Sequence, residues 1–280
     1  MAIVQTDLPV TSRRTTETIA ALVKTYPFLR TETIGTTAFQ RPLSTLVVGN
    51  GPRKVLFTAA HHANEWITTL VLLKFVEDLA QAIQENGQIF GVDAAEIAQK
   101  ANIYTIPLVD PDGVDLNLQY PAGWPQARQI KFAQGFTRPG PRDYVGRAPL
   151  DQMESRALAG FTEFLQPELV LAYHTQGRVI YWKYLDIEVP GARAFAEAFA
   201  RVSGYTAEDT PYASGFAGYK DWFIERWRRP GFTIEVGLGE NPLPISQFEQ
   251  IYKENLGILT IAALGEDFLN ISIDISPEVI

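Results

Sequence analysis

Residues 55–69 read VLFTAAHHANEWITT, an apolar run that ends at two histidines and leads, past a glutamate, into a helical pattern. The part at 55–59 has the aliphatic and β-branched residues of a buried strand. From residue 66 to 83, apolar positions recur every three or four residues, which is typical of a half-buried helix. We therefore predict a strand, a turn that holds His62 and Glu65, and a long helix.

The rest of the chain alternates between strand and helix patterns in the same way. We predict further strands at 46–48, 102–109, 169–174 and 232–236, and helices at 15–24, 153–164, 193–202, 222–227 and 246–264. Such alternation is typical of an α/β fold, here a single-domain, mixed and mostly parallel twisted sheet with helices on both faces. Because we find no repeat and no linker, we predict one domain over residues 1–280, with residues 1–40 as a lead-in segment packed on it.

Residues 120–150 form the one long region without clear periodicity, and several prolines lie in it. Loops longer than about 12 to 15 residues are usually functional or disordered. Since Trp124, Phe132, Phe136 and Tyr144 lie within this region, we predict an ordered loop that walls a site.

Composition excludes several classes of function. The 280 residues carry a formal charge of -8, which argues against nucleic acid as a partner. No stretch approaches the roughly 20 apolar residues that cross a bilayer, so we predict no membrane span. The absence of cysteine excludes disulfides and thiolate metal sites, so any metal is held by His, Asp or Glu. The N-terminus has no basic segment followed by an apolar run, which favours a cytoplasmic location.

All three histidines of the chain, His61, His62 and His174, lie at predicted strand ends. A single histidine is more often a hydrogen-bonded structural residue than a ligand. Here, however, His62 and Glu65 stand three residues apart across a strand-to-helix turn, and the carboxyl ends of strands are where sites of α/β sheets gather. Two histidines and a glutamate form a common catalytic zinc set, so we predict one Zn²⁺ per chain. Glu235, at the end of the strand at 232–236, is placed to act as a general base near that metal, or else is a solvated strand-end carboxylate.

Several ordered motifs resemble the zinc carboxypeptidase family, and especially its branch of γ-D-glutamyl-L-diamino-acid (meso-diaminopimelate) endopeptidases. They are YPFL at 26–29, AAHHANEWITT at 59–69, PDGVDLN at 111–117, PAGW at 121–124, GPRDY at 140–144, YHTQG at 173–177, FTIEVG at 232–237 and NPLP at 241–244. The resemblance implies that the domain is a zinc carboxypeptidase-like catalytic domain.

The resemblance also implies roles for individual residues. His62, Glu65 and His174 carry over as zinc ligands, and Glu235 carries over as the general base. Asp115 matches the aspartate that hydrogen-bonds a ligating histidine. Asn117 matches an asparagine that contacts the substrate carboxylate, and Tyr212 a mobile tyrosine that closes over substrate. His61 precedes a ligand and is expected to be structural.

Two departures from the family pattern concern arginines. Leu118 follows Asn117, where carboxypeptidases of the A type have an arginine that pairs with a free C-terminus, so a plain carboxypeptidase is disfavoured. The family's oxyanion arginine is also missing, because the two motifs that flank it are fused here. Its candidate replacements lie in the long loop and are Arg128, Arg138, Arg142 and Arg147. Of these we expect Arg142 and Arg147 to bind substrate.

Three hypotheses follow. The first is a zinc-dependent peptidase that hydrolyses γ-D-glutamyl-diamino acid linkages in bacterial cell-wall peptides, its partner being a peptide derived from muropeptides. The second is a zinc amidohydrolase or deacylase of the same fold that acts on N-acyl amino acids. The third is a zinc-dependent binding protein for wall peptides with weakened catalysis. The sequence leaves the oligomeric state open.

Overall fold

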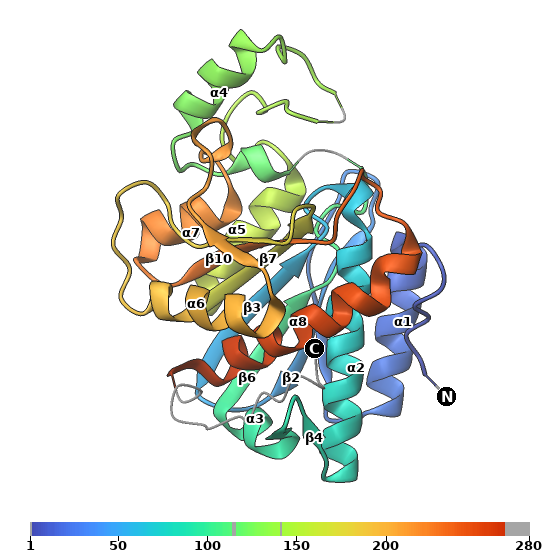
Figure 1. The fold of residues 1–280 in the computed structure, drawn as a ribbon. Coiled ribbons are helices and arrows are strands. Elements are labelled where there is room, and N and C mark those ends of the chain that lie inside the picture. The colour runs from blue at the N-terminus through green and yellow to red at the C-terminus, as the bar shows by residue number, and fades with distance from the viewer. Residues whose placement is uncertain (1, 114–115, 141, 267–280) are drawn as a thin grey trace.

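The computed structural model describes residues 2–113, 116–140 and 142–266 of the chain. Its centre is an eight-stranded sheet in the order β1-β2-β6-β3-β7-β10-β8-β9 (Figure 1). The strands are β1 (Arg30–Thr36), β2 (Pro42–Gly49), β3 (Arg53–Ala59), β6 (Ala101–Ile106), β7 (Leu169–Thr175), β8 (Val179–Tyr181), β9 (Thr206–Glu208) and β10 (Gly231–Val236). A small hairpin, β4 (Gln88–Ile89) and β5 (Val92–Asp93), lies outside it.

The four strands in the middle of the sheet, β6, β3, β7 and β10, run parallel to one another. On one side, β2 pairs antiparallel with β6, and β1 pairs antiparallel with β2. On the other side, β8 pairs antiparallel with β10. The carboxyl ends of β3, β7 and β10 therefore meet at one edge of the sheet, as the sequence predicts for His62, His174 and Glu235.

Helices cover both faces of the sheet, which confirms the predicted fold class (Figure 1). They are α1 (Ser12–Thr25), α2 (Ile67–Glu85), α3 (Ala94–Lys100), α4 (Trp124–Ala133), α5 (Met153–Leu165), α6 (Ala192–Ser203), α7 (Tyr219–Trp227) and α8 (Phe248–Leu264). Helices α1, α2, α3, α6 and α8 pack on one face, and α5 and α7 on the other. Within the described residues, no helix is both long enough and apolar enough to cross a membrane.

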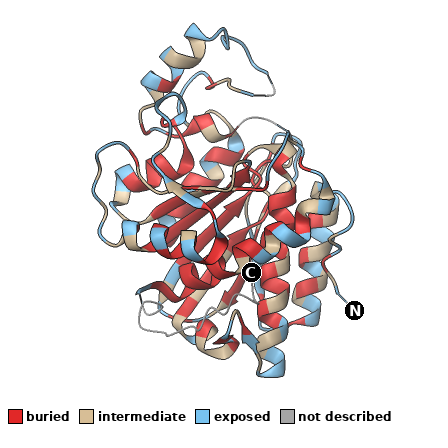
Figure 2. Ribbon diagram, viewed as in Figure 1, coloured by how far each residue is buried: buried red, intermediate tan, exposed pale blue. Residues whose placement is uncertain are grey.

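The strand side chains alternate between two hydrophobic cores, one on each face. In β3, Phe57 packs into the core beneath α2 and α8, whereas its neighbour Leu56 packs beneath α5 and α7. In β7, Tyr173 and Ala172 divide in the same way. Each buried leucine or phenylalanine contributes about 1.5 to 3 kcal/mol, and Figure 2 shows that the central strands are largely buried. This double burial fixes the strand ends that hold the site.

The prediction of a loop throughout residues 120–150 is wrong for residues 124–133, which form α4. This helix stands away from the sheet at the top of Figure 1 and is largely exposed in Figure 2. Among its residues only Ala127 is buried, so no apolar stripe marks it in the sequence. Two kinds of contact stabilise it: the Arg128 guanidinium lies over the ring of Phe132, 4.6 Å from the centroid, and Trp124, Ile130 and Phe132 pack against the second core.

Candidate metal centre

The turn between β3 and α2 places His62 and Glu65. It is a 3₁₀ turn, η1 (Ala63–Glu65), and the hydroxyl of Thr68 stabilises it with two hydrogen bonds. That hydroxyl donates to the backbone oxygen of Glu65 at 2.7 Å and accepts from the backbone nitrogen of Ala60 at 3.0 Å. The Glu65 side chain is thereby buried at the end of the sheet.

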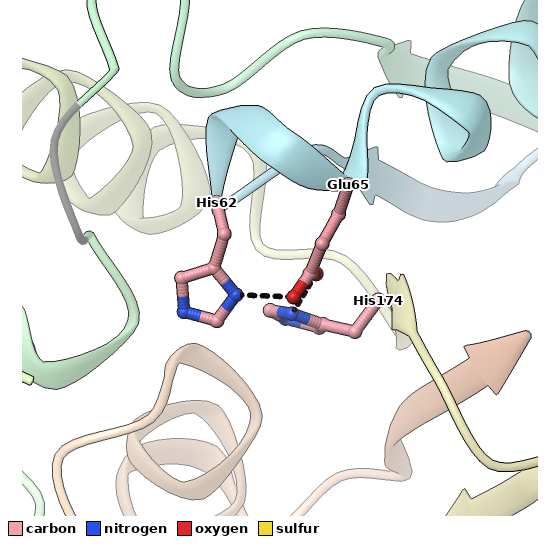
Figure 3. Close-up of side chains that lie close together, drawn as sticks. All are labelled: His62, Glu65 and His174. Carbon is pink, nitrogen blue, oxygen red and sulfur yellow. Dashed lines mark hydrogen bonds and ion pairs between the residues drawn. The ribbon is translucent and has the colours of Figure 1, made fainter. Parts of the chain in front are cut away.

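Glu65 lies between two imidazoles, as Figure 3 shows. Its Oε1 is 2.8 Å from Nδ1 of His62, and its Oε2 is 3.0 Å from Nδ1 of His174, which comes from the end of β7. One ligand atom from each of the three residues falls within 4.8 Å of the others, so the group could hold one metal ion. Two imidazole nitrogens and a carboxylate fit zinc, with a fourth position left for water or substrate.

The surroundings keep Glu65 ionised although it is buried. Burial by itself would raise the pKa of this carboxyl, but the nearby His62 and His174 rings outweigh that effect and hold the pKa well below its usual range. Burial also lowers the pKa of His174, although the hydrogen bond to Glu65 and the charge of that carboxylate oppose the shift. A carboxylate and neutral imidazoles are the protonation states that bind a metal.

His61 lies behind the centre rather than in it, as expected. It is fully buried, its Nε2 is 2.9 Å from the Thr58 hydroxyl, and its ring stacks on His174 with centroids 5.1 Å apart. The ring of Tyr219 lies against it at 5.6 Å. His61 thus supports the ring of His174 by packing.

Glu235 stands beside His174, because β10 runs parallel to β7 with these two residues in register. Burial, with the negative charge of Glu65 adding to it, raises the pKa of Glu235 to about 8. His62 and Arg142 oppose this shift. A bound dication would lower this raised pKa, towards a value suited to exchanging protons near neutral pH.

Of the two loop arginines expected to bind substrate, the structure brings one to the centre. Nη2 of Arg142 lies 3.8 Å from Oε1 of Glu65, and nearly half of its side chain is exposed. Arg147 instead forms a two-point ion pair with Asp151, Nη2 to Oδ1 at 2.8 Å and Nε to Oδ2 at 3.1 Å. The guanidinium of Arg147 is therefore already paired with a carboxylate of the protein.

The other predicted site residues that the structure describes contact residues outside the group of His62, Glu65 and His174. Asn117 lies in η2 (Asn117–Gln119), where its Oδ1 accepts from the backbone nitrogen of Tyr219 at 3.4 Å. Tyr212, in η3 (Tyr212–Ser214), is exposed and its ring contacts Phe216 edge-on at 5.0 Å. Asp115 lies outside the described residues. Leu118 packs in the second core, so no cation occupies its position.

Sequence reasoning missed two residues that contact the centre. Thr175, the last residue of β7, donates its backbone N–H to Oε2 of Glu65 at 3.2 Å. Asn241, in the loop after β10, donates from Nδ2 to Oε1 at 3.4 Å. The only sequence signal for either is their presence within the motifs YHTQG and NPLP.

Comparison with known proteins agrees with this site. Residues 15–257 match the sequence profile of the zinc carboxypeptidase family. Gamma-D-glutamyl-L-diamino acid endopeptidase 1 of Lysinibacillus sphaericus is 39% identical over 277 residues, which cover 86% of this chain and 68% of that protein.

Two solved structures show the same fold at low sequence identity. Bovine thrombin-activatable fibrinolysis inhibitor, in complex with tick carboxypeptidase inhibitor, superposes with a TM-score of 0.77 at 18% identity, over 95% of this chain and 99% of that one. Murein-tripeptide amidase MpaA from Escherichia coli O157 does so with a TM-score of 0.56 at 17% identity, over 82% and 91%. With a profile match over most of its length, a relative this similar and three donors that fit zinc, the chain belongs to the zinc carboxypeptidase family of metallopeptidases.

Proposed function

We propose that this zinc metallopeptidase hydrolyses the bond between a γ-linked D-glutamyl residue and a diamino acid in bacterial cell-wall peptides. The observation that carries the proposal is the 39% identity to an endopeptidase named for that bond, extended over 86% of this chain. Residues 1–280 act as one catalytic unit in this proposal, on peptides derived from muropeptides. A cytoplasmic location stays a prediction, which cell fractionation would test.

In the proposal, His62, Glu65 and His174 hold the zinc. Zinc held there would polarise the scissile carbonyl and lower the pKa of the attacking water, so that the water could lose a proton near neutral pH. Glu235 takes the proton from the attacking water and delivers it to the leaving nitrogen. Its register beside His174 supports this role, since the base then lies within the same strand-end site as the ligands.

Arg142 is the candidate for the missing oxyanion arginine. Its cation at the edge of the centre, partly exposed, is placed to stabilise negative charge that develops on the scissile carbonyl oxygen. Tyr212 and Asn117 are proposed to close over and orient the substrate. Asp115 is proposed to hydrogen-bond a ligating histidine.

Leu118 favours an endopeptidase over a carboxypeptidase. A free C-terminal carboxylate is bound best by the two-point fork of an arginine. The residue after Asn117 is instead an apolar side chain that packs in the core, so this position offers no such fork.

The decisive experiment offers the zinc-loaded protein L-alanyl-γ-D-glutamyl-diaminopimelate and follows the products by mass spectrometry. We expect L-alanyl-D-glutamate and free diaminopimelate, and no release by Glu235→Gln at the same zinc content. A panel of N-acyl amino acids and of ordinary peptides is assayed in parallel. Cleavage of either in place of the wall peptide would overturn the substrate assignment while leaving the metal chemistry intact.

A further inference from the structure

We infer that Asn241 and Thr175 are positioning residues that fix the Glu65 carboxylate for metal binding. The inference rests on the proposed ligand set. It concerns residues to which neither the family resemblance nor the metal-ligand geometry gives a role. Its basis is the hydrogen bonding around one buried carboxylate.

Each oxygen of Glu65 accepts one hydrogen bond from a group other than the two imidazoles. Oε2 accepts from the backbone N–H of Thr175 at 3.2 Å, and Oε1 accepts from Nδ2 of Asn241 at 3.4 Å. The same two oxygens lie 2.8 Å from Nδ1 of His62 and 3.0 Å from Nδ1 of His174. Thr175 and Asn241 therefore hold the carboxylate from outside the group of three residues that could bind a metal.

The amide of Asn241 is itself locked by Thr175. The Thr175 hydroxyl donates to Oδ1 of Asn241 at 2.5 Å, and Nδ2 of Asn241 donates to the Thr175 backbone oxygen at 3.1 Å. A flipped amide would set its oxygen against two acceptors, the Thr175 carbonyl and the Glu65 carboxylate. The two residues thus form a closed pair in which the hydroxyl of one determines where the N–H of the other points.

A neutral amide suits this position for electrostatic reasons. An aspartate here would place a second negative charge against Glu65, and a lysine would pair with the carboxylate and compete with the metal. Asn241 supplies a hydrogen bond without either effect. Because its loop follows β10, which carries Glu235, the same contact also ties the ligand to the strand of the base.

The test measures zinc affinity, in competition with a chromophoric chelator, on metal-free full-length protein. Loss of a group that orients a ligand typically weakens metal binding about 10- to 100-fold, and we expect this for Asn241→Ala. Thr175→Val removes the hydroxyl at nearly constant volume and should weaken binding as well, whereas Thr175→Ser should restore it. Excess zinc should return much of the lost kcat with KM unchanged.

Asn255→Ala is the matched control, because Asn255 is another buried asparagine with two hydrogen bonds, to Tyr205 Oη at 2.9 Å and to the Ile251 backbone oxygen at 2.8 Å. It should melt at a lower temperature yet bind zinc as the wild type does. Wild-type zinc affinity in Asn241→Ala and Thr175→Val would overturn the inference alone. If Asn241→Ala does not fold, the comparison of Thr175→Val with Thr175→Ser decides. If the wild type binds no zinc, the ligand set and the inference fall together.

Discussion

Nη2 of Arg142 lies 3.8 Å from Oε1 of Glu65, so a partly exposed cation of the long loop reaches the buried carboxylate of the metal centre. Once zinc neutralises that carboxylate, the guanidinium is available to other negative charge. The position is therefore suited to an anion that forms during the reaction.

We expect Arg142→Ala to lower kcat by about 10²- to 10³-fold, the usual effect of losing a preorganised oxyanion donor. Zinc content should stay at one ion per chain, because Arg142 is not a ligand. Arg147→Ala is the matched control, and its effect should be small because Asp151 already holds that guanidinium at 2.8 Å. Steady-state kinetics and metal analysis check both. Equal losses in the two variants would contradict the assignment.

Glu235→Gln should keep its zinc and lose about 10²- to 10⁴-fold in kcat, since a positioned general base contributes that much. The glutamine has the same shape but cannot accept the proton. Metal analysis and single-turnover kinetics on one preparation separate the two effects. Retained activity would assign the base to another residue.

Glu65→Ala should abolish zinc binding, because it removes the only carboxylate of the three-ligand group. In the wild type, zinc at about 100 times its Kd should raise the free energy of unfolding by about 2.7 kcal/mol. The variant should show no such increase. Thermal melts with and without zinc test this, and stabilisation of the variant by zinc would show that the metal binds elsewhere.

Glu154, buried in the first turn of α5, should make stability depend on pH. Burial raises the pKa of this carboxyl, and the charge of Asp112 adds to the effect. The folded state therefore keeps the proton more tightly than the unfolded state. As the pH rises above about 4.3, the ordinary glutamate value, unfolding becomes easier.

Glu154→Gln stays neutral at every pH and should be more stable than the wild type at pH 7.5. The difference should shrink as the pH falls through about 4.3, because the glutamate becomes protonated in the unfolded state as well. Urea denaturation of the metal-free proteins measures it at both pH values. A variant less stable than the wild type at pH 7.5 would show that the charge of Glu154 stabilises α5 instead.

Much of the fold could be predicted because strands that are buried on both faces of the sheet, and helices that cover it, require regular patterns of apolar residues. The strands β3, β7 and β10 and the long helices α2 and α8 all bury apolar faces, and each was expected close to its observed bounds. Edge elements were missed. The first four residues of β1, from Arg30 to Thr33, are exposed, and β8 and β9 have only three residues each, so hydrophobic patterning has little to act on.

The grouping of His62, Glu65 and His174 could be predicted because the three residues lie at or just after the ends of buried strands, which the sequence locates well. The contacts of Thr175 and Asn241 could not, because they depend on how the loop after β10 folds back over β7. Nor could the sequence choose among the loop arginines. Only the structure shows that Arg147 is paired with Asp151 while Arg142 faces Glu65.

Helix α4 and the chain after it form an appendage, because Nε1 of Trp124 donates to the Val145 backbone oxygen at 2.9 Å and so draws the two ends together (Figure 1). A surface segment that leaves and re-enters the body at neighbouring points tolerates changes in length and composition better than the sheet does, provided that Ala127 and Val145 keep their places in the second core. The segment carries Arg142 to the edge of the metal centre. Changes in this segment that keep Arg142 should therefore alter which substrates the enzyme accepts while the proposed metal ligands stay fixed.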